Sequence, residues 1–142
     1  MTIGVQAGSG AGARVRANGR GGTWIAGMVL TVIVWAFLAF DVVGKFARPQ
    51  AVVDGTTGLG FEQRDILTIG LLLLIGLVLW TIPRTAVLGA VWISAYLGGA
   101  VAVNLAGGFG VAGYVLSPVY VGVAIWVAMF LRRPELRKAF FG

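Results

Sequence analysis

Long apolar runs, separated by short polar or glycine-rich segments, dominate the chain. The runs cover about residues 23–46, 65–82, 85–105 and 116–131. Each is near the length of about 20 residues that an α-helix needs to cross the hydrocarbon core of a bilayer. Pro83 ends the second run, because proline lacks the amide hydrogen and disfavours helix in the residue before it. The pattern predicts an all-α membrane protein, a bundle of four transmembrane helices.

Composition supports a membrane location and excludes several classes of protein. Of the 142 residues, 58% are hydrophobic and only 11% are charged, whereas soluble domains are about 45–50% apolar and about 25% charged. The chain has no cysteine and no histidine, which excludes disulfides, imidazole catalysis and the usual zinc and haem ligands. Its net charge of +6 comes from cations that flank the apolar runs, so nucleic-acid binding is not expected. No residue is assigned a catalytic or metal-binding role.

The basic residues predict the domain boundary and the orientation in the membrane. Residues 1–22 are rich in glycine and alanine and lack an apolar period, so we expect a disordered tail before a four-helix domain over residues 23–142. A cleaved signal peptide is the competing interpretation, but the first apolar run is longer than a typical signal-peptide core. Eight Lys and Arg residues flank one set of helix ends and three flank the other. The positive-inside rule then predicts that both termini are cytoplasmic and that the long connection over residues 47–64 is outside.

Small residues recur every four positions along the third run, in PRTAVLGAVWISAYLGGAVAVN. On a helix this spacing makes a ridge that lets a neighbouring backbone approach closely. We expect the ridge, and the glycines within it, to pack against another helix. The predicted packing residues are Ala90, Ser94, Gly98, Gly99 and Ala102.

Asp41 and Lys45, in FDVVGKF at the outer end of the first run, are the first candidates for a functional site. Their i,i+4 spacing lets the carboxylate and the ammonium meet on one helix face. Charges near membrane depth are costly and usually face the bundle interior or a partner. Two interpretations remain open. One is a polar site that handles a headgroup, a quinone or a proton; the other is an ion pair that anchors the helix end, with Lys45 reaching towards water.

Three further polar residues lie on or beside the third run. Arg84 can hold a lipid phosphate or a carboxylate in a bidentate contact, or serve only as a topology determinant. Tyr96 lies near mid-span, where its hydroxyl needs a partner on another helix or in a ligand. Asn104 lies near the outer end, at the depth of Asp41. From depth alone we expect Asp41, Lys45 and Asn104 to surround one outward-facing pocket.

The chain resembles the DoxX-like family of small bacterial membrane proteins in the strings FDVVGK, IPRTAVLGAVWISAYLGGAVAVN and LRRPELR, over about residues 24–138. In that family the first helix typically ends with Asp followed four residues later by Lys, and the third begins with Pro-Arg-Thr-Ala and carries Tyr-Leu-Gly-Gly-Ala. The positions that match this pattern are Asp41, Lys45, Arg84, Tyr96, Gly98 and Gly99. Two positions depart from it. Val42 replaces a glycine, and Asn104 stands where a histidine is common, which weakens any proton-transfer or metal role.

The resemblance implies a four-helix bundle in the bacterial inner membrane and no settled activity. Relatives that bear the DoxX name are linked to quinone-reducing sulfur oxidation and to membrane complexes that manage oxidative stress. We therefore expect an accessory protein that binds a lipophilic molecule, a quinone or a membrane lipid, or that supports a membrane redox partner protein.

Two other functions compete with this expectation. One is a membrane subunit of an oxidoreductase, in which a bound cofactor would supply all the redox chemistry; we do not expect enzymatic activity from the chain on its own. The other is a transporter. It is less favoured for a monomer, because four spans without a repeat or a polar stripe give no path, although a homo-oligomer could enclose one.

Overall fold

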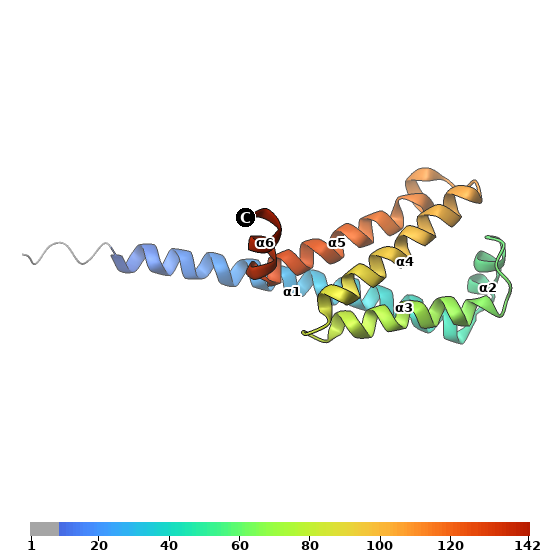
Figure 1. Ribbon diagram of the computed structural model, residues 1–142, viewed down its shortest axis with the longest axis horizontal. Helices are drawn as coiled ribbons and strands as arrows, with labels where there is room; N and C mark the ends of the chain where they lie inside the picture. Colours follow the sequence, from blue (N-terminus) through green and yellow to red (C-terminus); the bar gives the residue numbers. More distant parts are fainter. Residues whose placement is uncertain (1–8) are drawn as a thin grey trace, which may run out of the picture.

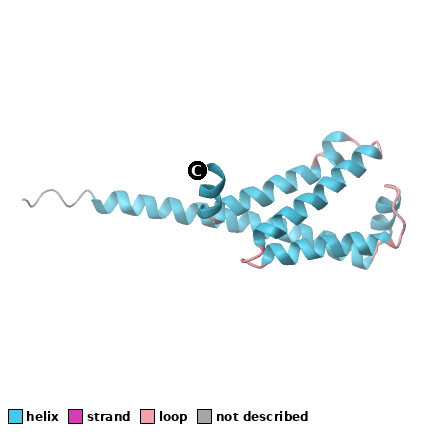
Figure 2. Cartoon of the chain, in the orientation of Figure 1, coloured by secondary structure: helices cyan, strands magenta, loops and turns pink. Residues whose placement is uncertain are grey.

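The computed structural model describes residues 9–142, with side chains from residue 21 onward. Regular secondary structure in this range is entirely helical (Figures 1 and 2). The elements are α1 (Ser9–Ala47), α2 (Gln50–Thr57), α3 (Asp65–Thr81), α4 (Ala86–Ala106), the short π-helical segment η1 (Val111–Val115), α5 (Ser117–Arg132) and α6 (Pro134–Phe141). The protein is all-α, as the sequence predicts.

Within the described residues, three segments are long and apolar enough to cross a membrane: Gly21–Ala47, Ala86–Ala106 and Val111–Arg132. α3 is also apolar but has only 17 residues, a length of about 26 Å against a hydrocarbon core of about 30 Å. The bounds of α3, α4 and α5 agree with the predicted runs to within about one residue, because proline, glycine and charge mark the ends of these runs.

α1 begins earlier than the sequence predicts. Residues 1–8 lie outside the described range, but from Ser9 to residue 22 the tail predicted to be disordered is helical. Alanine and arginine are good helix formers, and extending an existing helix is much less costly than nucleating a new one. The extension projects beyond the ends of the other helices (Figure 1).

α1, α3, α4 and α5 pack side by side, and successive members of this set run in opposite directions (Figure 1). α1 contacts α3 and α5, and α4 contacts the same two helices. We call the end that holds α6 and the α3–α4 turn the α6 end, and the end that holds α2 and η1 the α2 end. Most of the apolar core lies between the middle of the bundle and the α6 end. Its fully buried members on these helices include Leu38, Leu73, Ile93, Ile125 and Met129.

Two glycines allow α3 and α4 to approach closely. A Cβ atom at Gly89 would overlap the backbone nitrogen and Cα of Trp80, and a Cβ at Gly76 would lie 2.7 Å from side-chain atoms of Trp92 and Ile93. Lipid tails are as apolar as leucine, so membrane helices are held together by close packing and not by escape from water. The absence of a side chain at these two positions therefore sets the distance between α3 and α4.

The ridge of small residues predicted on α4 is packed over only part of its length. Ala90 is fully buried and Ser94 is half-buried. Further along, Gly98, Gly99 and Ala102 are exposed, and a Cβ at either glycine would meet nothing within 4 Å. The packing expected for these three residues is therefore absent from the described chain. Because four residues cover about 400° of an α-helix, the ridge turns about 40° at each step and leaves the face that buries Ala90.

Polar contacts hold the helices together at the α6 end. Arg132 Nη1 donates a hydrogen bond to Thr31 Oγ1 on α1 at 3.2 Å, and Arg133 Nη2 donates to the Pro83 carbonyl in the α3–α4 turn at 2.6 Å. A Cβ at Gly27 on α1 would lie 2.8 Å from Cγ of Arg132, so α1 and α5 also approach closely here. The bundle is closed at its α6 end and open at its α2 end.

Replacing Gly89 with alanine should destabilise the protein, because the added methyl group would overlap Trp80 backbone atoms that cannot rotate away. Overpacking of this kind typically costs about 1–3 kcal/mol or more. The midpoint of thermal unfolding of the purified protein in detergent measures the effect. Gly98→Ala, on the same helix but facing open space, is the matched control and should not lower the midpoint. Equal losses in the two variants would contradict the assigned packing.

Candidate functional site

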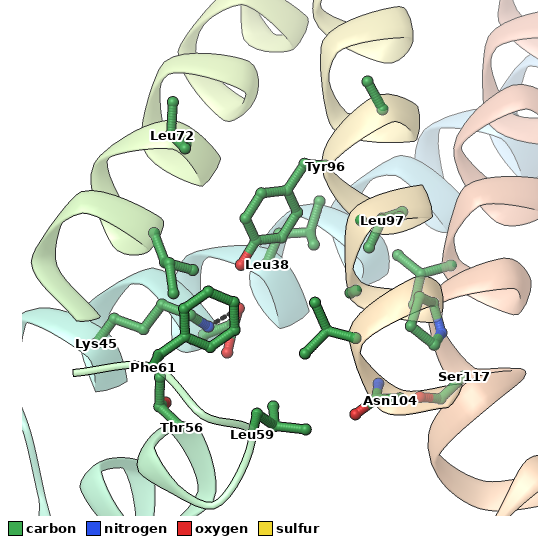
Figure 3. Close-up of a pocket in the computed structure, with 18 of the residues that line it drawn as sticks. Leu38, Lys45, Thr56, Leu59, Phe61, Leu72, Tyr96, Leu97, Asn104 and Ser117 are labelled. Carbon is green, nitrogen blue, oxygen red and sulfur yellow. Dashed lines mark hydrogen bonds and ion pairs between the residues drawn. The ribbon is translucent and has the colours of Figure 1, made fainter. Parts of the chain in front are cut away.

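The diverging helices surround a pocket at the α2 end (Figure 3). Its volume is about 560 Å³, within the range of about 300–1,000 Å³ that is typical of small-molecule sites. The walls come from α1, α3, α4 and α5, and the segment from α2 to α3 contributes Thr56, Leu59 and Phe61. Most of the lining side chains are apolar, and a few polar groups from different helices project among them.

The Asp41–Lys45 ion pair is the charged part of this lining. Lys45 Nζ lies 2.5 Å from Asp41 Oδ2, and the lysine side chain is only 13% exposed while the aspartate is 41% exposed. Gly70 on α3 makes room for the lysine, since a Cβ there would lie 3.0 Å from Lys45 Cβ. Lys45 is therefore enclosed between α1 and α3 and does not reach out to water. Because each charge faces its counter-ion, the pair adds no net charge to the pocket.

Two side chains from α4 complete the polar lining. Tyr96 points its hydroxyl towards Lys45 (Figure 3); among the residues that the structure describes, this hydroxyl has no hydrogen-bond partner. Asn104 Nδ2 donates to the Tyr114 carbonyl in η1 at 3.0 Å. Asn104 thus has a structural role in joining α4 to η1, while its side chain still lines the pocket. Ser117, at the start of α5, adds a hydroxyl to the same end.

The pocket brings together most of the site residues predicted from the sequence. Asp41, Lys45, Tyr96 and Asn104 all line it. Arg84 does not: it is exposed in the α3–α4 turn at the opposite end of the bundle. The pocket is a geometric fact of the structure, and ligand binding by these residues stays a prediction.

Sequence reasoning missed the contribution of the connection after α1. Arg48, with a φ of 50°, turns the chain from α1 into α2, and Gly60, with a φ of 89°, redirects it after α2. These turns bring Leu59 and Phe61 over the pocket. The available signal was the set of large apolar residues in this connection, Val52, Val53, Leu59 and Phe61, since such residues tend to find an apolar contact.

The pocket is suited to binding. In the described part of the chain, no group of three or more His, Cys, Asp or Glu side chains is placed to hold a metal ion. The polar groups are an ion pair, a phenol, an amide and a hydroxyl, which together donate and accept hydrogen bonds. They are distributed among the apolar side chains of the cavity, a lining that combines apolar surface with a few hydrogen-bonding groups.

A model of the DoxX-like family matches residues 29–128. The chain belongs to the DoxX-like family. With its three candidate spans it is a multi-pass membrane protein of that family. All the residues that line the pocket fall within the DoxX-like match, whereas α6 lies beyond it. No curated protein and no solved structure gives a match.

Replacing Asp41 with asparagine should destabilise the protein, because it removes the counter-charge from a largely enclosed lysine. Breaking a fully buried pair costs about 3–5 kcal/mol, and the partial exposure of Asp41 should reduce this to about 1–3 kcal/mol. The double variant Asp41→Asn/Lys45→Met has no unpaired charge and should regain most of the lost stability. Thermal unfolding in detergent compares the two. If the double variant were no more stable than the single one, the pairing would not be what stabilises Lys45.

Proposed function

We propose that this DoxX-like protein is an accessory membrane protein that binds a lipophilic small molecule in the pocket at the α2 end. The single observation that carries the proposal is the pocket itself, an apolar cavity whose lining also includes Lys45, Tyr96 and Asn104. Ligand sites are typically apolar cavities with a small number of converging polar groups. The two candidate ligand classes are a quinone and a membrane lipid.

The electrostatics of the pocket favour a ligand with an uncharged head. Lys45 is already neutralised by Asp41, so an anionic phosphate would have to compete with Asp41 for the ammonium group. Desolvating an uncompensated anion is costly. A carbonyl oxygen carries no such cost and can accept a hydrogen bond from Lys45 or from the Tyr96 hydroxyl. Among the two ligand classes, a quinone head satisfies these conditions and a phospholipid phosphate does not.

We further propose that α1, α3, α4 and α5 form a bundle of four spans with both termini in the cytoplasm. α3 is short, but it packs between α1 and α4, each of which is long enough to span. Charge supports the orientation. Four of the five carboxylates lie at the α2 end, while Arg84, Arg132, Arg133, Arg137 and Lys138 lie at the α6 end. Basic residues are retained on the cytoplasmic side, so the pocket would lie in the outer half of the membrane.

Tyr96→Phe should weaken quinone binding without loss of stability. A single hydrogen bond contributes about 0.5–1.5 kcal/mol, so affinity should fall about twofold to tenfold. The probes are a short-chain benzoquinone and a short-chain naphthoquinone, titrated into the purified full-length protein and followed by tryptophan fluorescence. Phosphatidylglycerol serves as the anionic comparison and should bind less tightly in the pocket.

The matched control is Tyr120→Phe, an exposed tyrosine on α5 that does not line the pocket. It should bind the quinones as the wild type does. Mass spectrometry of lipid extracts from the purified protein gives an independent result, because a bound quinone should co-purify. The proposal fails if neither quinone binds, or if both tyrosine variants bind equally weakly.

Reporter fusions test the orientation. A fluorescent protein that matures only in the cytoplasm should be fluorescent when fused after Gly142, and alkaline phosphatase at the same position should be inactive. Insertion of each reporter into the connection between α2 and α3 should reverse both results. A fluorescent insertion in that connection would place the pocket on the cytoplasmic side.

A further inference from the structure

α6 turns back at the end of α5. The candidate span that contains α5 ends at Arg132, and Arg133 is extended, with φ −125° and ψ 90°, before Pro134 begins α6. The rings of Phe140 and Phe141 lie 5.7 Å and 5.6 Å from the ring of Phe130 on α5. Because α6 follows a span immediately and packs against the last turns of that span, it lies at the boundary between membrane and water.

α6 carries both large apolar side chains and cations, and Leu136 and Phe140, four residues apart, share one of its faces. Leu136 packs against the apolar core, and Phe140 and Phe141 remain 61% and 75% exposed despite their contacts with α5. Arg137 and Lys138, between these residues in the sequence, are exposed. A short helix that presents large apolar rings beside cations is typical of a helix that lies in the plane of the membrane interface.

Among the residues whose side chains are described, the cations at this end form no ion pair. In the part of the chain that the structure describes, both ion pairs lie at the α2 end. Glu135 is the single carboxylate at the α6 end among the described residues, and it forms neither of these pairs. Arg84 joins the basic group, since the neighbouring Pro83 carbonyl accepts a hydrogen bond from Arg133. Desolvated or clustered cations favour a nearby anion.

We propose that α6 lies in the bilayer interface and that Arg137 and Lys138 bind the headgroups of anionic phospholipids, with Arg84 in the α3–α4 turn at the same end of the bundle. The phenylalanine rings enter the acyl boundary and place the two cations at headgroup depth. This site is separate from the pocket, at the other end of the bundle, and it does not depend on the proposed function. The chemistry it recognises is a phosphate ester held in the plane of the membrane.

Hydrogen exchange of the full-length protein in lipid nanodiscs tests the proposal. The amides of residues 134–141 are compared in discs of phosphatidylcholine and in discs that also contain phosphatidylglycerol. The attraction of each cation to the anionic surface should slow amide hydrogen exchange in α6 about fivefold. Arg137→Gln/Lys138→Gln should abolish the difference between the two kinds of disc. Raising the ionic strength should reduce the difference for the wild type, because salt screens headgroup attraction.

The matched control is Arg48→Gln/Arg64→Gln, which removes two exposed cations at the α2 end. It should leave the lipid dependence of α6 unchanged, and circular dichroism should show equal helix content in all three proteins. Equal exchange of α6 in both kinds of disc would overturn the proposal. Loss of the lipid dependence in the control variant would also overturn it, because the effect would then follow net charge and not the cations on α6.

Discussion

The close approach of α3 and α4 at Gly89 is the constraint on which the rest of the structure depends. Without a side chain at this position, the Trp80 backbone lies directly against α4, and the two helices meet at the α6 end. Arg132 and Arg133 fix α5 to α1 and to the α3–α4 turn at the same end. Helices joined tightly at one end and inclined to one another must separate at the other. The pocket is the consequence of this separation.

Polar residues occupy the separated end because the packing there leaves room for them. Gly70 accommodates the stem of Lys45 between α1 and α3, and the lysine then meets Asp41 one helical turn away on its own helix. Tyr96 and Asn104 come from the part of α4 where small residues no longer contact a neighbouring helix. A polar group in this environment needs a hydrogen-bond partner within the protein, since water is scarce and lipid tails neither donate nor accept hydrogen bonds. Asp41 and Lys45 satisfy one another and Asn104 bonds to η1, while the Tyr96 hydroxyl has no hydrogen-bond partner among the described residues.

The two ends of the molecule therefore have different chemistry. The α2 end combines charges of both signs, an ion pair and an apolar cavity. The α6 end is basic, and its aromatic rings lie at the boundary of the span that precedes them. This difference in chemistry requires no movement that links the two ends, because the chemistry of each end depends on the residues at its own helix termini. In the function we propose, one end holds the lipophilic ligand and the other sets the position of the protein in the bilayer.

The sequence by itself determined the family, the helical class and the limits of α3, α4 and α5, because apolar runs bounded by proline, glycine and charge are local features. It also indicated that Asp41 and Lys45 would pair, since i,i+4 spacing is a property of one helix. The positions of Asp41, Lys45 and Asn104 along their apolar runs were sufficient to predict that the three residues line one pocket. Periodicity predicted a ridge that includes Gly98 and Ala102, but only the tertiary structure decided that the ridge packs as far as Ser94 and no further. The structure also decided that Leu59 and Phe61 reach the pocket and that α6 folds back on α5. These features depend on crossing angles and chain turns between distant residues, which the hydrophobic pattern of a single helix does not specify.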